Sequence, residues 1–115
     1  MPPNRIALRL YWDPIMMGPG KADLLQAIAE EGSISAAGRR MGMSYRRAWA
    51  LVEEMNAGFC APVVSSARGG TRGGGAHLTE TGTEVLRLYR QLLERFRESC
   101  NDDIAALEAL TGPRD

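Results

Sequence analysis

Apolar and polar residues alternate along this chain with two different periods. From Ile6 to Tyr11 every second residue is strongly apolar, which is typical of a half-buried strand. Residues 13–20 are rich in proline and glycine, so we expect a turn there, although its three apolar side chains can still pack inward. From Lys21 to about Glu31 the apolar residues follow a helical spacing, and Gly32 stands where a left-handed residue can end that helix.

Two short amphipathic helices with a turn between them are predicted next. Ser33 or Ser35 can cap the first helix, which we expect to run to about Met41. Gly42 can adopt the left-handed conformation of a tight turn, and Ser44 can then cap a second helix. Two short helices joined by a glycine-containing turn form a helix-turn-helix.

A glycine-rich loop between two short strands follows the second helix. Residues 62–66 and 76–79 have the composition of strands, and the loop between them holds five glycines together with Arg68 and Arg72. A strand, loop and strand directly after a helix-turn-helix form the wing of a winged helix. Glycine lets a backbone approach phosphate closely, and arginine can reach a phosphate or a minor groove. The alternative is a hairpin tip without a ligand.

The start of the second helix carries side chains suited to a nucleic acid. Three apolar residues of this helix are spaced to face inward: Ala48, Val52 and Met55. Tyr45, Arg46 and Trp49 therefore point outward, and we expect them to contact base edges in a major groove. The polar and cationic side chains expected on phosphates and in the grooves are Ser33, Ser35, Ser44, Arg47, Arg68 and Arg72. The alternative is that the arginines are only solvated and the aromatic rings are partly buried.

From about Glu80 the chain is predicted to be helical, with Thr79 as its cap or a capping box that begins at Thr81. Apolar residues fill seven of eight successive a and d positions, and neighbouring leucines widen the stripe. A helix that is apolar on two sides needs two partners, so we expect it to contact its own domain and a second subunit. The residues expected at the dimer interface are Leu86, Tyr89, Leu93, Phe96, Cys100 and Leu107.

Two alternatives stay open for this last helix. It can be an ordinary amphipathic helix that only covers its own domain. In addition, residues 101–103 can stop it and cap a shorter helix that begins near Ile104.

The net charge of zero conceals a segregation of charge along the chain. Residues 39–79 carry six arginines and two glutamates, a net of +4, whereas residues 1–38 sum to −1 and residues 80–115 to −3. A protein that binds nucleic acid needs a basic surface patch rather than a basic total. Because this patch coincides with the predicted helix-turn-helix and wing, double-stranded DNA is the expected partner.

Length and composition limit the class of protein. A chain of 115 residues suits one domain, in which we distinguish a DNA-reading unit (1–80) from a dimerisation helix and tail (81–115). Cys60 and Cys100 lie far apart without a CxxC pair, which favours free thiols over a zinc site. No apolar run is long enough for a membrane helix, so we expect a cytoplasmic protein.

The sequence does not suggest an enzyme. His77 stands alone, without cysteine, histidine or carboxylate at ligand spacing, and the hydroxyl side chains are better explained as helix caps. No acid–base pair or activated nucleophile can be assembled. We therefore expect no catalytic residue, no metal and no cofactor.

Four segments of the chain, in this order, resemble one known family. They are Gly32–Ala37 (GSISAA), Met43–Trp49 (MSYRRAW), Glu53–Asn56 (EEMN) and Gly69–Gly82 (GGTRGGGAHLTETG). Together they resemble the N-terminal DNA-binding domain of the ModE-type molybdate-responsive regulators, which is related to the LysR-type winged helix. The resemblance covers roughly residues 5–110.

This resemblance implies a homodimer joined by the long C-terminal helix, with its recognition helices in successive major grooves of a palindromic site. It also implies control, often by repression, of genes for molybdate transport or molybdenum enzymes. In the full-length family, separate C-terminal domains bind molybdate, and residues of that kind are absent from this sequence. We therefore expect no direct molybdate binding.

The predicted fold class is α+β, mainly α: a winged helix-turn-helix with a long C-terminal dimerisation helix. The predicted function is homodimeric, sequence-specific DNA binding that regulates transcription. The main alternative is a winged helix that docks a separate effector-binding protein, because fold alone does not settle function. The exposed arginines favour DNA, since a protein-binding surface would expose more aliphatic side chains there. A molybdate-binding protein is the third alternative.

Overall fold

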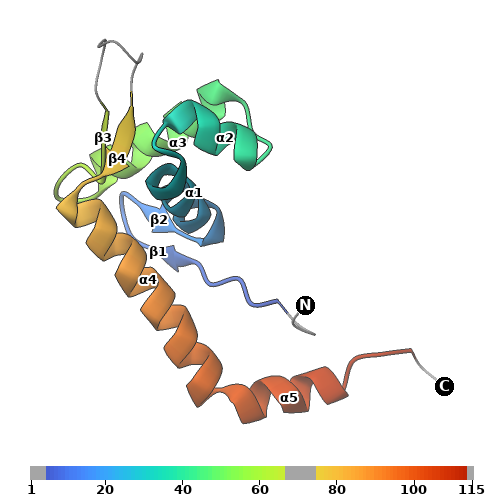
Figure 1. Cartoon of the computed structure of the whole chain (residues 1–115). Helices are drawn as coiled ribbons and strands as arrows, with labels where there is room; N and C mark the ends of the chain where they lie inside the picture. Colours follow the sequence, from blue (N-terminus) through green and yellow to red (C-terminus); the bar gives the residue numbers. More distant parts are fainter. Residues whose placement is uncertain (1–4, 67–74, 114–115) are drawn as a thin grey trace.

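The computed structural model describes residues 5–66 and 75–113, and its architecture is the predicted winged helix-turn-helix (Figure 1). These residues form five helices and two small antiparallel sheets, so the α+β, mainly α class is confirmed. In chain order the elements are β1 (Leu10–Tyr11), β2 (Met16–Met17), α1 (Pro19–Glu31), α2 (Ile34–Arg40), α3 (Tyr45–Gly58), β3 (Val64–Ser66), β4 (Ala76–Leu78), α4 (Glu80–Ser99) and α5 (Asn101–Ala109).

Helix α1 contributes more buried apolar side chains than any other described element. Leu24, Leu25 and Ile28 are completely shielded from solvent, and α1 contacts α2, β4 and α4. Burial of an aliphatic side chain of this size stabilises a fold by about 1.5–3 kcal/mol. The other elements are therefore assembled around α1.

Helices α2 and α3 approach each other closely because small residues meet between them. A Cβ atom placed on Gly38 would lie 3.2 Å from the Cβ of Ala48, which is tighter than an ordinary contact. Ala37 and Ala48 are completely buried. Small side chains at these positions therefore permit the close packing of the two helices.

The ends of the helices follow the predicted glycine and capping signals. Gly32 (φ 75°) ends α1 and Gly42 (φ 71°) turns the chain between α2 and α3, both in the left-handed region that favours glycine. The hydroxyl of Thr79 accepts a hydrogen bond from the backbone N–H of Gly82 at 3.0 Å. Thr79 is therefore the cap of α4, and the alternative capping box at Thr81 is not used.

The N-terminal segment forms a short hairpin that the alternating pattern alone did not predict. Strand β1 pairs antiparallel with β2, so only two residues of the predicted strand are paired and the predicted turn region contains a strand. Ile15 and Met17 are buried in the core, and this burial stabilises the folding of the hairpin onto the domain. Leu8, which precedes β1, is held by α4: its carbonyl oxygen accepts a hydrogen bond from the hydroxyl of Tyr89 at 2.6 Å.

Helix α4 runs away from the rest of the domain, and α5 continues from its far end after a bend (Figure 1). The structure extends over 62 × 28 × 22 Å with a radius of gyration of 17.1 Å, whereas a compact chain of this length has about 13 Å. The open question whether this helix is interrupted is settled, because the chain forms two helices here instead of one. The break falls at Cys100, and α5 begins at Asn101 rather than near Ile104, so Asp102 and Asp103 lie in its first turn.

Within the described residues, no helix combines the length and apolar character needed to span a membrane. Over 5–66 and 75–113, no group of three or more histidine, cysteine, aspartate or glutamate side chains could hold a metal ion. Cys60 and Cys100 are both free thiols.

Candidate nucleic-acid interface

The first turn of α3 is exposed and carries one tyrosine and two arginines. The hydroxyl of Ser44 accepts a hydrogen bond from the backbone N–H of Arg47 at 3.1 Å and thereby caps the helix, as predicted. The three apolar residues predicted to face inward from α3 are completely buried. As a result Tyr45 is 54% exposed, and Arg46 and Arg47 are exposed beside it.

Trp49 lies between this exposed turn and the core. It is half-buried and packs against the core, and its ring centroid lies 6.4 Å from that of Tyr45 with the planes tilted by 46°. An aromatic pair at this separation is favourable. Burial limits the surface that Trp49 offers to a base, so the predicted outward position holds for Tyr45 more fully than for Trp49.

The two serines at the start of α2 are half-buried and hydrogen-bonded. The hydroxyl of Ser33 accepts from the backbone N–H of Ala36 at 2.9 Å, so Ser33 rather than Ser35 caps this helix. The hydroxyl of Ser35 accepts from the guanidinium of Arg39 at 3.0 Å. A hydroxyl that accepts one hydrogen bond keeps its own proton for donation. Both serines can therefore still donate to a phosphate oxygen.

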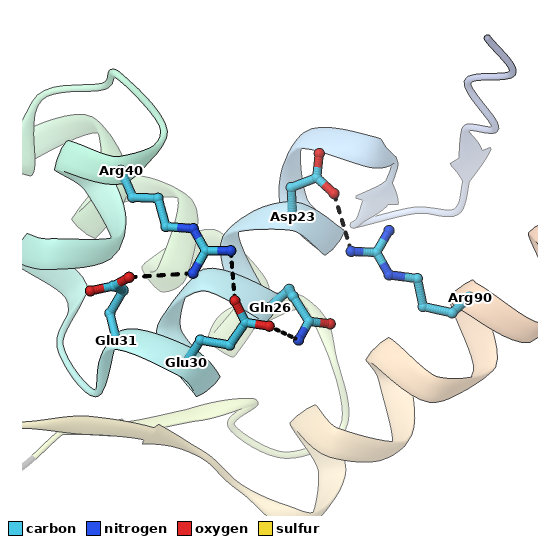
Figure 2. Close-up of polar contacts among 6 residues, drawn as sticks. All are labelled: Asp23, Gln26, Glu30, Glu31, Arg40 and Arg90. Carbon is cyan, nitrogen blue, oxygen red and sulfur yellow. Dashed lines mark hydrogen bonds and ion pairs between the residues drawn. The ribbon is translucent and has the colours of Figure 1, made fainter. Parts of the chain in front are cut away.

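The arginines of this region differ in how far their charge is already paired. Arg40, at the end of α2, pairs with Glu30 at 2.6 Å and with Glu31 at 3.3 Å, both at the end of α1 (Figure 2). Neither Arg46 nor Arg47 forms an ion pair with any described residue. The charge of Arg40 is thus offset within the fold, whereas the start of α3 keeps two arginines without an ion pair to a described residue.

Three exposed ion pairs connect α1 with α2 and α4 (Figure 2). The hydrogen bond from Arg40 and a second one from Gln26 (2.8 Å) hold the pKa of Glu30 below its ordinary value, and Glu30 raises the pKa of Arg40. On α4, Arg90 pairs with Asp23 of α1 at 3.1 Å. These contacts position α2 and α4 on the central helix.

Lys21, the single lysine of the chain, is buried at the start of α1. Its ammonium group donates to the carbonyl oxygen of Met16 at 2.8 Å and pairs with Glu54 of α3. A charge can be buried at acceptable cost when it is paired and hydrogen-bonded in this way. No pattern in the sequence indicated this contact, which joins β2, α1 and α3.

Strands β3 and β4 form the stem of the predicted wing. They pair antiparallel, and the backbone N–H of Ala76 donates to the carbonyl oxygen of Gly32 at 2.9 Å, which holds the stem against the end of α1. The predicted wing cations Arg68 and Arg72 lie outside the described residues.

Asn56, in the last turns of α3, was not among the predicted site residues, although it belongs to the EEMN segment. Its side-chain amide is hydrogen-bonded to the backbone of Val63 and Val64 at the start of β3. An amide side chain near the end of a helix, a few residues ahead of a strand, is the signal that could have identified it.

The residues expected at a dimer interface fall into two groups. Leu86 and Tyr89 are 9% and 3% exposed and belong to the core of their own domain, which removes them from the surface that a second subunit can reach. Burial also raises the pKa of Tyr89. The remaining predicted residues lie further along the chain. Three of them are half-buried, namely Leu93, Phe96 and Cys100, and Leu107 is 68% exposed.

Exposed leucines occupy the part of the molecule that extends beyond the core. Leu88 and Leu92, one turn apart on α4, are 47% and 45% exposed, and Leu107 and Leu110 are 68% and 84% exposed. Helix α5 has no buried residue at all. The apolar stripe that the sequence analysis identified is thus only partly covered by the domain itself.

Comparison with known proteins agrees with this geometry. Residues 21–83, more than half of the chain, match the family described as bacterial regulatory helix-turn-helix protein, lysR family. Molybdenum-pterin-binding protein MopB of Rhodobacter capsulatus is 45% identical over 103 residues, which cover 84% of this chain and 37% of that protein. DNA-binding transcriptional dual regulator ModE of Escherichia coli (strain K12) is 38% identical over 92 residues, which cover 80% of this chain and 35% of that protein.

The chain therefore spans little more than a third of the length of these relatives. Among solved structures, full-length CbnR complexed with its target DNA matches with a TM-score of 0.56 and 24% identity, over 76% of this chain and 28% of that chain. This match supports the fold, and the relatives named ModE confirm the predicted resemblance to that type of regulator. With its helix-turn-helix and wing stem inside the matched residues, the chain belongs to the lysR family of bacterial regulatory helix-turn-helix proteins.

Proposed function

We propose that this chain is a sequence-specific DNA-binding regulator of transcription that reads double-stranded DNA with the start of α3. The observation that carries the proposal is the exposed first turn of α3, where Arg46 and Arg47 form no ion pair with a described residue and Tyr45 lies open beside them. Arginine can bind the O6 and N7 atoms of guanine with two parallel hydrogen bonds in the major groove. The family is itself described as regulatory.

The proposed contacts divide by chemistry. Arg46 and Tyr45 would contact base edges, with Trp49 adding the part of its ring that the core leaves exposed. The groups proposed for phosphate and groove contacts are Ser33, Ser35, Ser44, Arg47, Arg68 and Arg72. Backbone contacts of this kind position a protein on the duplex, whereas base contacts supply the sequence preference.

The proposed assembly is a homodimer joined through α4 and α5. A helix such as α5, which buries none of its residues and exposes Leu107 and Leu110, is not stabilised by its own domain. Leu88 and Leu92 continue this apolar surface along α4. A two-fold dimer would present two copies of α3 to half-sites about 34 Å apart, one turn of DNA.

Several relatives are named as molybdenum transport proteins or as molybdenum-pterin-binding proteins. We propose that the genes controlled by this chain are likewise related to molybdenum and that the control is repression in the cytoplasm. The affinity for DNA with and without molybdate tests whether this domain itself responds, and we expect no change.

Fluorescence anisotropy with a labelled duplex from the upstream region of the chain's own gene tests the proposed function. If each protomer of a dimer neutralises four phosphates, the logarithm of the binding constant should fall against the logarithm of salt concentration with a slope of about −7. An unrelated duplex of equal length should bind at least tenfold more weakly. No binding to any duplex would instead favour a protein-interaction module.

A further inference from the structure

The side chain of Asn56 binds the outer edge of β3. Its Oδ1 accepts hydrogen bonds from the backbone N–H groups of Val63 at 2.8 Å and Val64 at 3.1 Å. Its Nδ2 donates to the carbonyl oxygen of Val64 at 3.2 Å. One side-chain amide therefore satisfies three backbone groups where the chain enters the wing.

The direction of the β3–β4 ladder explains why the two backbone groups of Val64 are available. The N–H of Thr79 donates to the carbonyl oxygen of Val63 at 3.0 Å, and Val64 stands opposite Leu78. In an antiparallel pair, successive residues bond alternately to the partner strand and to the opposite side. The N–H and C=O of Val64 therefore point away from β4, toward an edge with no third strand among the described residues.

Asn56 takes the place of a third strand at this edge. A side-chain amide offers one acceptor oxygen and N–H donors, the same groups that a peptide of a neighbouring strand would offer. Aspartate would lack the donor and would place a carboxylate oxygen against the carbonyl of Val64. Glutamine would hold the amide one methylene further from the helix. Both the chemistry and the length of asparagine are thus used.

This contact joins two elements that DNA binding requires in one fixed arrangement. Among the hydrogen bonds of the described residues, those of Asn56 alone connect α3 with β3 or β4. The other contacts of the stem lead elsewhere: Ala76 bonds to the end of α1, and the hydroxyl of Thr79 donates to the carbonyl oxygen of Pro62 at 2.6 Å.

We propose that Asn56 is the positioning residue that fixes the wing relative to the recognition helix α3, so that both can engage one duplex. The proposal rests on the proposed DNA-binding function for its consequence, although the positioning itself is a property of the free protein. Asn56 acts through β3 and makes no contact with DNA.

The positioning is tested without DNA by residual dipolar couplings of backbone amides in the free protein. In the wild type, one alignment tensor should fit the amides of α3 and those of Ser65 and His77 in the stem. In Asn56→Ala, the alignment tensor that fits the stem amides should be smaller in magnitude than that of α3 by about a third or more, because the stem then reorients independently of α3. Gln91→Ala, which removes an exposed amide from α4, should keep a single tensor. One tensor for both parts of Asn56→Ala would overturn the proposal.

The effect on binding is tested by a double-mutant cycle. Asn56→Ala should weaken binding to the specific duplex about tenfold, and the loss should shrink to less than twofold when Arg68 and Arg72 are already alanine, because no wing contact is left to misplace. An undiminished tenfold loss in that background would overturn the proposal, since Asn56 would then act on stability or on α3. If Asn56→Ala does not fold, Asn56→Asp, which retains an acceptor for Val63 and Val64 but loses the donor, should also weaken binding and show the same coupling. Altered couplings in a protein that binds no duplex would refute the proposed function but not the positioning.

Discussion

Gly82 lies against the carbonyl oxygen of Val63 so closely that a Cβ atom on residue 82 would be 2.0 Å from that oxygen. The first turn of α4 is thereby packed directly on the backbone that enters β3. The obstacle is backbone rather than a flexible side chain, so it cannot move aside without displacing the strand.

Gly82→Ala should therefore destabilise the fold by about 1–3 kcal/mol, the usual cost of forcing extra volume into a packed site. Urea denaturation measures the change. Gly20→Ala is the matched control, because a Cβ atom at Gly20 meets nothing within 4 Å and the residue lies in α1. This control should be neutral or more stable by up to about 1 kcal/mol. Equal effects of the two substitutions would contradict the close packing at Gly82.

Arg46→Ala should weaken binding to the specific duplex by about 1–3 kcal/mol and relax the preference for one base pair. Its stability in urea should be unchanged, because Arg46 is exposed and pairs with no described residue. Anisotropy titrations against duplexes with single base changes provide the measurement. Arg5→Ala, which removes an exposed arginine from the N-terminal segment, should bind like the wild type. A loss that is equal on all duplexes would make Arg46 a phosphate contact.

Leu92→Glu should convert the dimer into a monomer, because it places a charge within the exposed apolar stripe of α4. Sedimentation equilibrium would report the mass, and the affinity for a site with two half-sites should fall to that for one. Gln91→Glu adds the same charge at the preceding exposed position and should leave the mass unchanged. A dimeric Leu92→Glu protein would mean that this part of α4 is not the interface.

The Glu30–Arg40 pair should contribute stability only where Glu30 is ionised. Because Arg40 lowers the pKa of Glu30 in the folded state, the contribution is present above the ordinary pKa of 4.5 and is lost as pH falls through the lowered value. Arg40→Ala should therefore be less stable than the wild type at neutral pH, and the difference should vanish in acid. Urea denaturation from pH 7 to pH 3 measures it. A difference that does not depend on pH would mean that Arg40 acts through packing instead of charge.

The parts of the fold that could be predicted from the sequence are those set by contacts between residues close together in the chain. The caps at Ser33, Ser44 and Thr79 and the left-handed glycines Gly32 and Gly42 depend on hydrogen bonds within a few residues. For that reason helix ends, the turn between α2 and α3, and the exposed start of α3 could be predicted from spacing alone.

Contacts between distant segments were the part that could not be predicted. Whether an arginine is free or paired depends on which helix lies beside it, and Arg40 meets two glutamates of α1. The apolar stripe of α4 likewise does not show where the domain ends, so Leu86 and Tyr89 were assigned to a second subunit although their own core buries them. The role of Asn56 depends on the path of the strand that follows it.

Site-specific photo-crosslinking reports which part of the protein surface touches DNA. A benzophenone amino acid at position 45, on the exposed start of α3, should crosslink to bases of the specific duplex at positions one helical turn apart. The same group at position 12, where Trp12 is 55% exposed on the N-terminal hairpin, should give no crosslink. If the protein still binds but crosslinks from position 12 and not from position 45, the start of α3 is not the part that contacts the bases.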